Sequence, residues 1–224
     1  MARAVKRDDA DLAERILDVA EALCGRHGLE GVSLRQISAA AGTANNYAVQ
    51  YYYGDVHGLI TAVLAKRVPQ VEAMRVALLS EIKTRRQVTT RALIDVLYRP
   101  LIDCVDASGE RAYARFVLAL LSSPAGERYA AQTFHLMSAS AQVLDLLCEK
   151  HPTIPPALLV ERQRLLASMV LTSLFNRRAP YNSPKCDAAL IDNVLDMAAA
   201  ALAAPVSEPV QALMQKARRL KGAK

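Results

Sequence analysis

The chain has 224 residues, and 52% of them are hydrophobic, which excludes disorder as its main state and allows one sizeable core or two small ones. Aromatic residues make up only 5%, and Ala and Leu dominate, so the predicted fold class is all-α. The net charge is +6, but residues 1–67 contain eight Lys or Arg and eight Asp or Glu. Bulk basicity therefore gives no argument for a nucleic-acid partner.

The sequence contains no run of about 18 or more apolar residues, the length that would span a membrane, so we expect no membrane partner. Its N-terminus, MARAVKRDDADLAE, turns acidic where a signal peptide would need an apolar stretch. These features predict a cytoplasmic location. The cysteines at positions 24, 104, 148 and 186 form no C-x-x-C pair and are expected to be core thiols.

The first predicted helix spans residues 9–27, where apolar residues recur at spacings of three and four and acidic residues occupy the first turn. A second, short helix is predicted from residue 34 to about residue 41. Its start is indicated by Ser33 and Gln36, which have the spacing of a capping box. Gly42 should end this helix in a left-handed conformation, and Thr43 should cap a third helix through its side-chain oxygen.

The third predicted helix, residues 44–53, carries polar but uncharged side chains. At 100° per residue, its inward side is predicted to hold Ala44, Ala48 and Tyr51. The outward side is predicted to hold Asn46, Val49, Gln50 and Tyr53.

Amides and phenols on this helix suit a recognition helix in the major groove of double-stranded DNA. Asn and Gln pair bidentately with adenine, while a tyrosine can reach a phosphate oxygen or pack on a thymine methyl. Positioning would come from Ser33, Arg35 and an N-terminal arm containing Arg3, Lys6 and Arg7. The alternative for the tyrosines at 51–53 is that they pack over a small core, and we expect this for at least one of them. The alternative for the amides is that they are solvated surface groups.

A fourth helix is predicted to start after Asp55 and to continue past Pro69 toward Lys83, with a bend at the proline. Further helical stretches are predicted at about 87–107, 110–121, 125–149, 157–178 and 185–203. No Gly/Ser linker interrupts residues 66–70, so the domain boundary there should be helical. The predicted domains are an N-terminal unit, a helical body and a basic tail, at residues 1–66, 67–204 and 205–224.

Residues from about Leu12 to Leu64 contain the motif G-x-x-x-x-S-L-R-Q-I-S-x-x-A-G, a short helix ending in aromatics, and then G-L-I. This segment resembles the DNA-binding domain of the TetR family of transcriptional regulators. The matching positions are Gly28, Ser33, Leu34, Ile37, Ala41, Gly42, Tyr52 or Tyr53, and Leu59. The stretch from Gly42 to the last aromatic is one residue longer than the commonest form, and D-V-H replaces the usual lysine of the fourth helix, so a phosphate contact there is lost or passes to His57.

The resemblance implies a homodimer that binds a palindromic operator, usually as a repressor, and releases DNA when a small molecule enters the C-terminal helical domain. By position it implies DNA contacts from Ser33, Arg35, Thr43, Asn45, Asn46, Tyr47, Gln50, Tyr51 and Tyr52. It also implies that the last two long helices form the dimer interface. The alternative for those helices is a core within one chain.

A mainly apolar effector is expected to contact bulky or polar-tipped residues of the middle helices. The candidates are Tyr113, Phe116, Tyr129, Phe134, His135 and Met137, each of which could instead be ordinary core. The tail could add non-specific DNA affinity or be a solvated helix end.

No Gly-rich phosphate loop or catalytic triad pattern stands out, so we expect no cofactor and no enzymatic activity. Cys148 and His151 lie three apart, but a metal site needs three or four ligands, and we expect no metal. The competing hypothesis is an all-helical binding or catalytic protein whose N-terminal unit does not bind DNA.

Overall fold

The computed structural model describes residues 2–45, 47–106, 108–176 and 186–213, with the side chains of all but residues 2–8, 130 and 134. Its described part consists of helices and contains no strand, which confirms the all-α prediction. The elements in chain order are α1 (Ala2–His27), α2 (Leu34–Ala40), α3 (Ala48–Tyr53), α4 (Val56–Lys83), α5 (Thr90–Asp103), α6 (Ala112–Ser122), α7 (Gly126–Thr133), the 3-10 turn η1 (Phe134–Leu136), α8 (Ser138–Lys150), α9 (Pro156–Phe175) and α10 (Asp187–Leu202).

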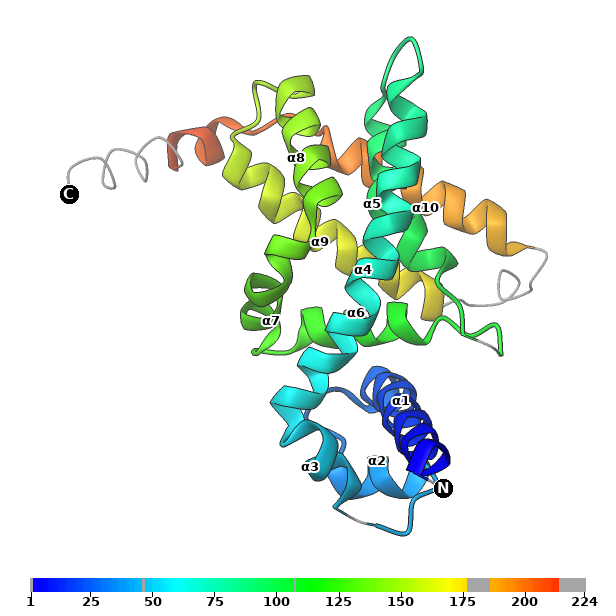
Figure 1. Cartoon of the computed structure of the whole chain (residues 1–224). Helices are drawn as coiled ribbons and strands as arrows, with labels where there is room; N and C mark the ends of the chain where they lie inside the picture. Colours follow the sequence, from blue (N-terminus) through cyan, green and yellow to red (C-terminus); the bar gives the residue numbers. More distant parts are fainter. Residues whose placement is uncertain (1, 46, 107, 177–185, 214–224) are drawn as a thin grey trace.

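The N-terminal helices α1, α2 and α3 form a small unit with the beginning of α4, and the later helices form a larger body (Figure 1). The first helix is longer than predicted, because it begins at Ala2 and includes the segment that was expected to be an arm. It packs against α6 of the body. A Cβ on Gly25 of α1 would lie only 3.0 Å from the backbone nitrogen of Phe116, so glycine is needed for this close approach.

Helix α4 belongs to both parts of the molecule and runs from the small unit into the body (Figure 1). Its start follows the prediction, since the Asp55 side chain accepts a hydrogen bond of 2.7 Å from the Gly58 backbone N–H. The helix continues through Pro69, which is exposed. Proline has no N–H to donate to the carbonyl one turn earlier, and on this exposed side water can donate that hydrogen bond instead. The prediction that residues 66–70 are helical is therefore confirmed.

Two side-chain contacts join the small unit to the body end of α4 and to α7. The buried Glu21 carboxylate on α1 receives two hydrogen bonds from Arg67 on α4, at 2.6 and 3.0 Å. His57 Nδ1, in the first turn of α4, lies 3.0 Å from the Tyr129 hydroxyl on α7. A displacement of α4 within the body would therefore be transmitted to the small unit.

The predicted helix over 125–149 is wrong in one respect, because the chain leaves the α-helix at residues 134–137 and restarts as α8. The cause is a tertiary contact. Glu72 of α4 accepts hydrogen bonds from the backbone N–H groups of Ala139 and Ser140, which start a new helix at this point. The helix predicted from about residue 125 begins at Gly126, and residue 185, where the last helix was predicted to start, lies outside the described residues.

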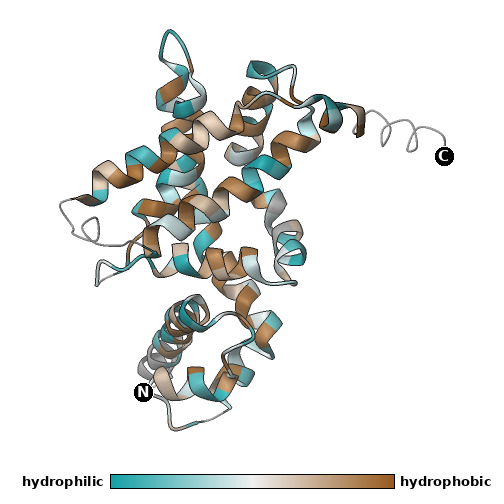
Figure 2. Cartoon of the chain, turned by 180° about the vertical axis from the view of Figure 1, so that it is seen from behind, coloured by the Kyte–Doolittle hydropathy of each residue, from teal (hydrophilic) through white to brown (hydrophobic). Residues whose placement is uncertain are grey.

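Apolar residues of the body helices gather where those helices cross, and the loop between α4 and α5 is hydrophilic (Figure 2). Leu159, Leu166, Val170 and Leu174 of α9 are all buried within this chain. Across the described ranges, no helix combines the length and the apolar character needed to cross a membrane.

Candidate nucleic-acid interface and ligand cavity

Helix α2 begins with the predicted capping box. The Ser33 hydroxyl oxygen accepts a hydrogen bond of 3.3 Å from the Gln36 backbone N–H, and the Ser33 N–H donates to the Gln36 side chain at 2.8 Å. After α2, Gly42 has φ of 72°, so this position takes the left-handed conformation that the sequence predicted. The start of the second helix and its end are thus both fixed by local chemistry.

The segment between Gly42 and α3 is a pair of side-chain turns rather than the beginning of a helix. Thr43 Oγ1 accepts from the Asn45 N–H at 3.1 Å, and Asn45 Oδ1 accepts from the Tyr47 N–H at 2.9 Å. Each side chain bonds the backbone two residues ahead, which competes with helix formation. The prediction that Thr43 caps the third helix is therefore wrong, and α3 begins at Ala48.

The orientation predicted for the third helix is also wrong. Ala48 and Val49 are both buried, whereas Ala44 and Tyr51 are exposed. The angular projection started at residue 44, which lies outside the helix, so it placed Val49 outward and Tyr51 inward. The true outward ridge consists of Gln50 and Tyr51 of α3, preceded by the exposed N-cap residue Tyr47.

Two tyrosines at the end of α3 attach this helix to α1. The Tyr53 hydroxyl donates to the Ala13 carbonyl at 2.7 Å, and the Tyr52 hydroxyl donates to Asp9 Oδ1 at 3.3 Å. The expectation that at least one of the tyrosines at 51–53 covers the small core is met by the half-buried Tyr53, but its predicted place on the outward side of the helix is wrong. Burial, with the nearby Asp9 charge, raises the pKa of Tyr52, so its hydroxyl remains a protonated donor at neutral pH.

Eight of the nine residues predicted to contact DNA belong to the described part of the small unit, in the segment from the start of α2 to the end of α3. The exposed members are Ser33, Arg35, Asn45, Tyr47, Gln50 and Tyr51. Thr43 and Tyr52 are half-buried, and Asn46 lies outside the described residues. Tyr47 and Tyr51 are 72% and 81% exposed, which is unusual for large aromatic side chains.

The charge on this side is small. Arg35 is the one Lys or Arg in the sequence between residues 28 and 65, and it is exposed on α2. The suggestion that His57 takes over a phosphate contact is not favoured by the geometry, because its Nδ1 contacts Tyr129 of the body. The side chains of Arg3, Lys6 and Arg7 lie outside the description.

The body contains a cavity of about 330 Å³ between α4, α5, α6, α8 and α9. Its volume is at the lower end of the range of about 300–1,000 Å³ typical of small-molecule sites. The lining residues are Arg75, Leu97, Tyr98, Leu101, Val117, Leu121, Met137, Ser140, Ala141, Leu144, Val160, Gln163, Arg164 and Ala167.

Of the six residues predicted to meet an effector, only Met137 lines this cavity. Tyr113 and Phe116 are buried elsewhere with their rings stacked, centroids 6.2 Å apart, and Tyr129 contacts His57. His135 is exposed, and the Phe134 side chain lies outside the description. Arg75 was not predicted, although the sequence shows a signal for it, an arginine within an apolar run three residues after Glu72.

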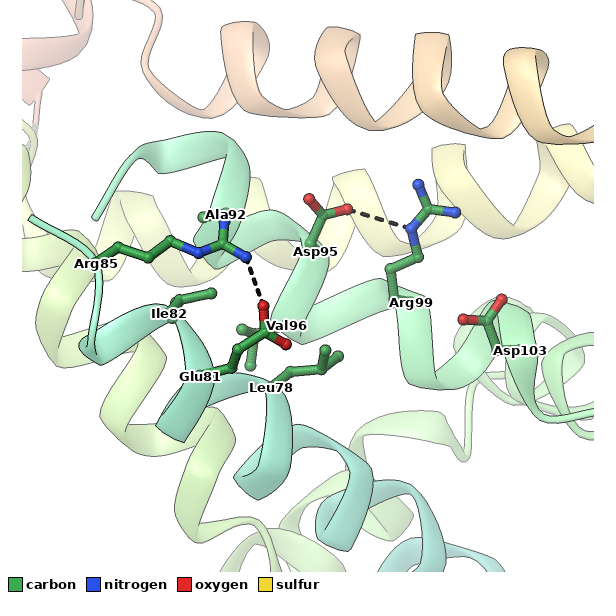
Figure 3. Close-up of a pocket in the computed structure, with 9 residues that line it drawn as sticks. All are labelled: Leu78, Glu81, Ile82, Arg85, Ala92, Asp95, Val96, Arg99 and Asp103. Atoms are coloured by element: carbon green, nitrogen blue, oxygen red, sulfur yellow. Dashed lines mark hydrogen bonds and ion pairs between the residues drawn. The ribbon is translucent and has the colours of Figure 1, made fainter. Parts of the chain in front are cut away.

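A second hollow, of about 250 Å³, lies between α4 and α5 (Figure 3). Its rim is charged, and four of the five charged residues there form two ion pairs. Arg85 contacts Glu81 at 2.7 Å, and Arg99 contacts Asp95 at 3.4 Å. Because these groups are already neutralised in pairs, this hollow is a poorer ligand site than the apolar cavity.

No protein-family model and no curated protein sequence matches the chain. Its structure is similar to that of a protein from Mesorhizobium loti assigned to the TetR-family transcriptional regulators, with 18% identity, a TM-score of 0.48, and coverage of 87% of this chain and 96% of that one. It is also similar to a protein from Vibrio parahaemolyticus with the same assignment, with 16% identity, a TM-score of 0.41, and coverage of 82% and 96%. Similarity this low assigns no function to the chain.

Proposed function

We propose that the chain is a sequence-specific DNA-binding transcriptional regulator of the TetR type, acting in the cytoplasm. The observation that carries the proposal is the outward ridge of Tyr47, Gln50 and Tyr51 on a helix whose opposite side is buried. A solvent-facing ridge with two large, exposed phenols and an amide, held in place by α1, suits contact with a groove of DNA.

Each side chain of this surface has a role that its chemistry supports. Gln50 pairs with an adenine through N6 and N7, and the tyrosines contact phosphate oxygens or a thymine methyl. Arg35 and Ser33 contact phosphates at the start of α2. The remaining proposed DNA contacts come from the turn and its borders: Thr43, Asn45, Asn46 and Tyr52.

We propose further that two copies of the chain pair through α9 and α10 and read a palindromic operator. Leu165 on α9 and Met197 on α10 are 53% and 52% exposed, although both helices are otherwise part of the core. Asp192 and Asp196, on another side of α10, are held by Arg91 of α5. These helices thus expose large apolar side chains among polar ones, which favours association with a second copy.

In this account residues 1–66 bind DNA, residues 67–204 bind an effector and a second copy, and residues 205–224 form a basic tail. The effector enters the cavity of the body and releases the protein, a repressor, from its operator. The cavity volume and its apolar wall support a small, mainly apolar effector.

The proposal is tested by selecting bound sequences from random duplex DNA with purified, folded protein. We expect enrichment of a site with two-fold symmetry and with adenines at mirrored positions. If folded protein enriches no sequence at moderate salt, DNA reading is contradicted. The competing hypothesis, a helical binding or catalytic protein without DNA affinity, would then be preferred.

A further inference from the structure

The charged groups on the cavity wall have one sign. Among its lining residues the ionisable side chains with charge at neutral pH are Arg75 and Arg164, and none is a carboxylate. Most of the remaining wall is aliphatic, from residues such as Leu97, Leu101 and Val117. A cavity of this kind favours a ligand with a large apolar part and a negative group.

Arg75 is the buried one of the two arginines, with 6% exposure. Its Nε and Nη2 donate to the Leu97 carbonyl at 3.2 and 2.9 Å, and its Nη1 donates to Glu72 at 3.3 Å. A guanidinium has five N–H donors, and these bonds use three of them. Arg75 can therefore donate further bonds to a group in the cavity.

Glu72 would normally neutralise Arg75, but its carboxylate has other donors. It accepts from the backbone N–H groups of Ala139 and Ser140, the latter at 3.1 Å, and from the Ser140 hydroxyl at 3.3 Å. These donors lie in the first turn of α8, where the helix dipole also stabilises a negative charge. Glu72 thus remains satisfied when Arg75 turns toward another anion.

We infer that the cavity binds an apolar molecule carrying a single anionic group, and that Arg75 and Ser140 hold that group in competition with Glu72. Both residues line the cavity and both contact Glu72, so they lie close together in a mostly apolar space. A neutral ligand would leave the guanidinium without the additional partner, and a cationic one would be repelled by it. The role of this ligand as the effector rests on the proposed function.

Ligand binding at this point would act directly on α4. Arg75 ties α4 to the Leu97 carbonyl of α5, and Glu72 ties it to α8. Arg75 lies 19 residues after Val56, the first residue of α4, which corresponds to ~28 Å along the helix. An anion that draws Arg75 away from Leu97 changes how α4 sits against α5, and the same helix carries the small unit at its other end.

The test uses three probes that share an eight-carbon chain and differ in the head group: octanoate, octan-1-ol and octylamine. Their binding to the whole protein is measured by calorimetry. We expect octanoate to bind at least about tenfold more tightly than octan-1-ol, the gain typical of a charge-assisted hydrogen bond, and octylamine to bind most weakly. Equal binding of octanoate and octan-1-ol, or no binding of any probe, would overturn the inference.

The double variant Glu72→Gln/Arg75→Met removes both charges together and so leaves no lone buried charge. It should lose the preference for octanoate, and Ser140→Ala should weaken it by a few-fold. The variant Arg164→Gln separates the two arginines of the cavity wall, because it removes the exposed one, which pairs with Glu161 at 3.0 Å. If Arg75 holds the anion, this variant should keep the preference. Loss of the preference in Arg164→Gln but not in the double variant would assign the anion to Arg164 and overturn the inference. These measurements need no DNA. Their result can therefore be interpreted even if the proposed operator binding proves wrong.

Discussion

The Tyr53 hydroxyl at the end of α3 donates a hydrogen bond of 2.7 Å to the Ala13 carbonyl on α1. Burial raises the pKa of this hydroxyl, so it remains protonated. The bond joins residues 40 positions apart and fixes the rotation of a six-residue helix about its axis. That rotation decides which side chains face outward, and it leaves Tyr47, Gln50 and Tyr51 in solvent.

Replacing Tyr53 with Phe should lower the free energy of unfolding by about 0.5–1.5 kcal/mol, the value of one net hydrogen bond. Urea denaturation measures this change. The matched control is Tyr51→Phe, whose hydroxyl is exposed and which should change stability by no more than about 0.5 kcal/mol. Equal destabilisation by both substitutions would contradict the role assigned to the Tyr53 bond.

A second prediction concerns the buried pair of Glu21 and Arg67, in which each charge is stabilised by the other. Arg67→Met alone should cost about 3–5 kcal/mol of unfolding free energy, since it leaves a buried carboxylate unpaired. The double variant Glu21→Gln/Arg67→Met should recover most of that loss. Arg85→Met, which removes one partner of the exposed pair with Glu81, should cost less than about 1 kcal/mol. Additive losses in the double variant would show that the two side chains do not act as a pair.

Features set by adjacent residues could be predicted from the sequence. The Ser33 and Gln36 capping box, the left-handed Gly42 and the Asp55 cap each follow from chemistry within four residues. The continuous helix across residues 66–70 followed from the missing Gly/Ser linker. These predictions needed no knowledge of distant contacts.

Features set by distant residues could not be predicted. The break before α8 depends on Glu72, which is 67 residues from Ala139. The orientation of α3 depends on α1, and the cavity wall combines side chains from five helices. The prediction that Thr43 caps the third helix was wrong for a local reason. A threonine side chain can cap a helix or a turn equally well, and the sequence does not say which.

His151 should make the stability of the protein depend on pH. Burial lowers the pKa of its imidazole below the ordinary value of 6.5, and the charges of Lys150 and Arg162 lower it further. Below about pH 6.5 the unfolded chain therefore binds a proton that the folded chain resists, so the free energy of unfolding falls as the pH falls. Denaturation curves at several pH values for the wild type and His151→Gln check this. The variant should lose less stability on acidification, and an identical pH dependence would contradict it.

The proposed pairing through α9 and α10 predicts the effect of a charge placed on that side. Leu165→Glu or Met197→Glu should convert a dimer into a monomer, because a buried, unpaired carboxylate in the interface is costly. Light scattering coupled to size exclusion measures the mass. The control is Val76→Glu on α4, whose side chain is 47% exposed and which should remain dimeric. A wild-type protein that is monomeric at all tested concentrations would contradict the pairing.

The most direct test of DNA reading by α3 is selection from random duplex DNA by the wild type and by Gln50→Ala in parallel. The account predicts that the variant enriches the same two-fold symmetric site but loses the preference at one base pair in each half, with a cost of about 1–3 kcal/mol there. An unchanged preference at every position of the site would contradict the assignment of Gln50 to base reading, and no enrichment by the folded wild type would contradict the central claim.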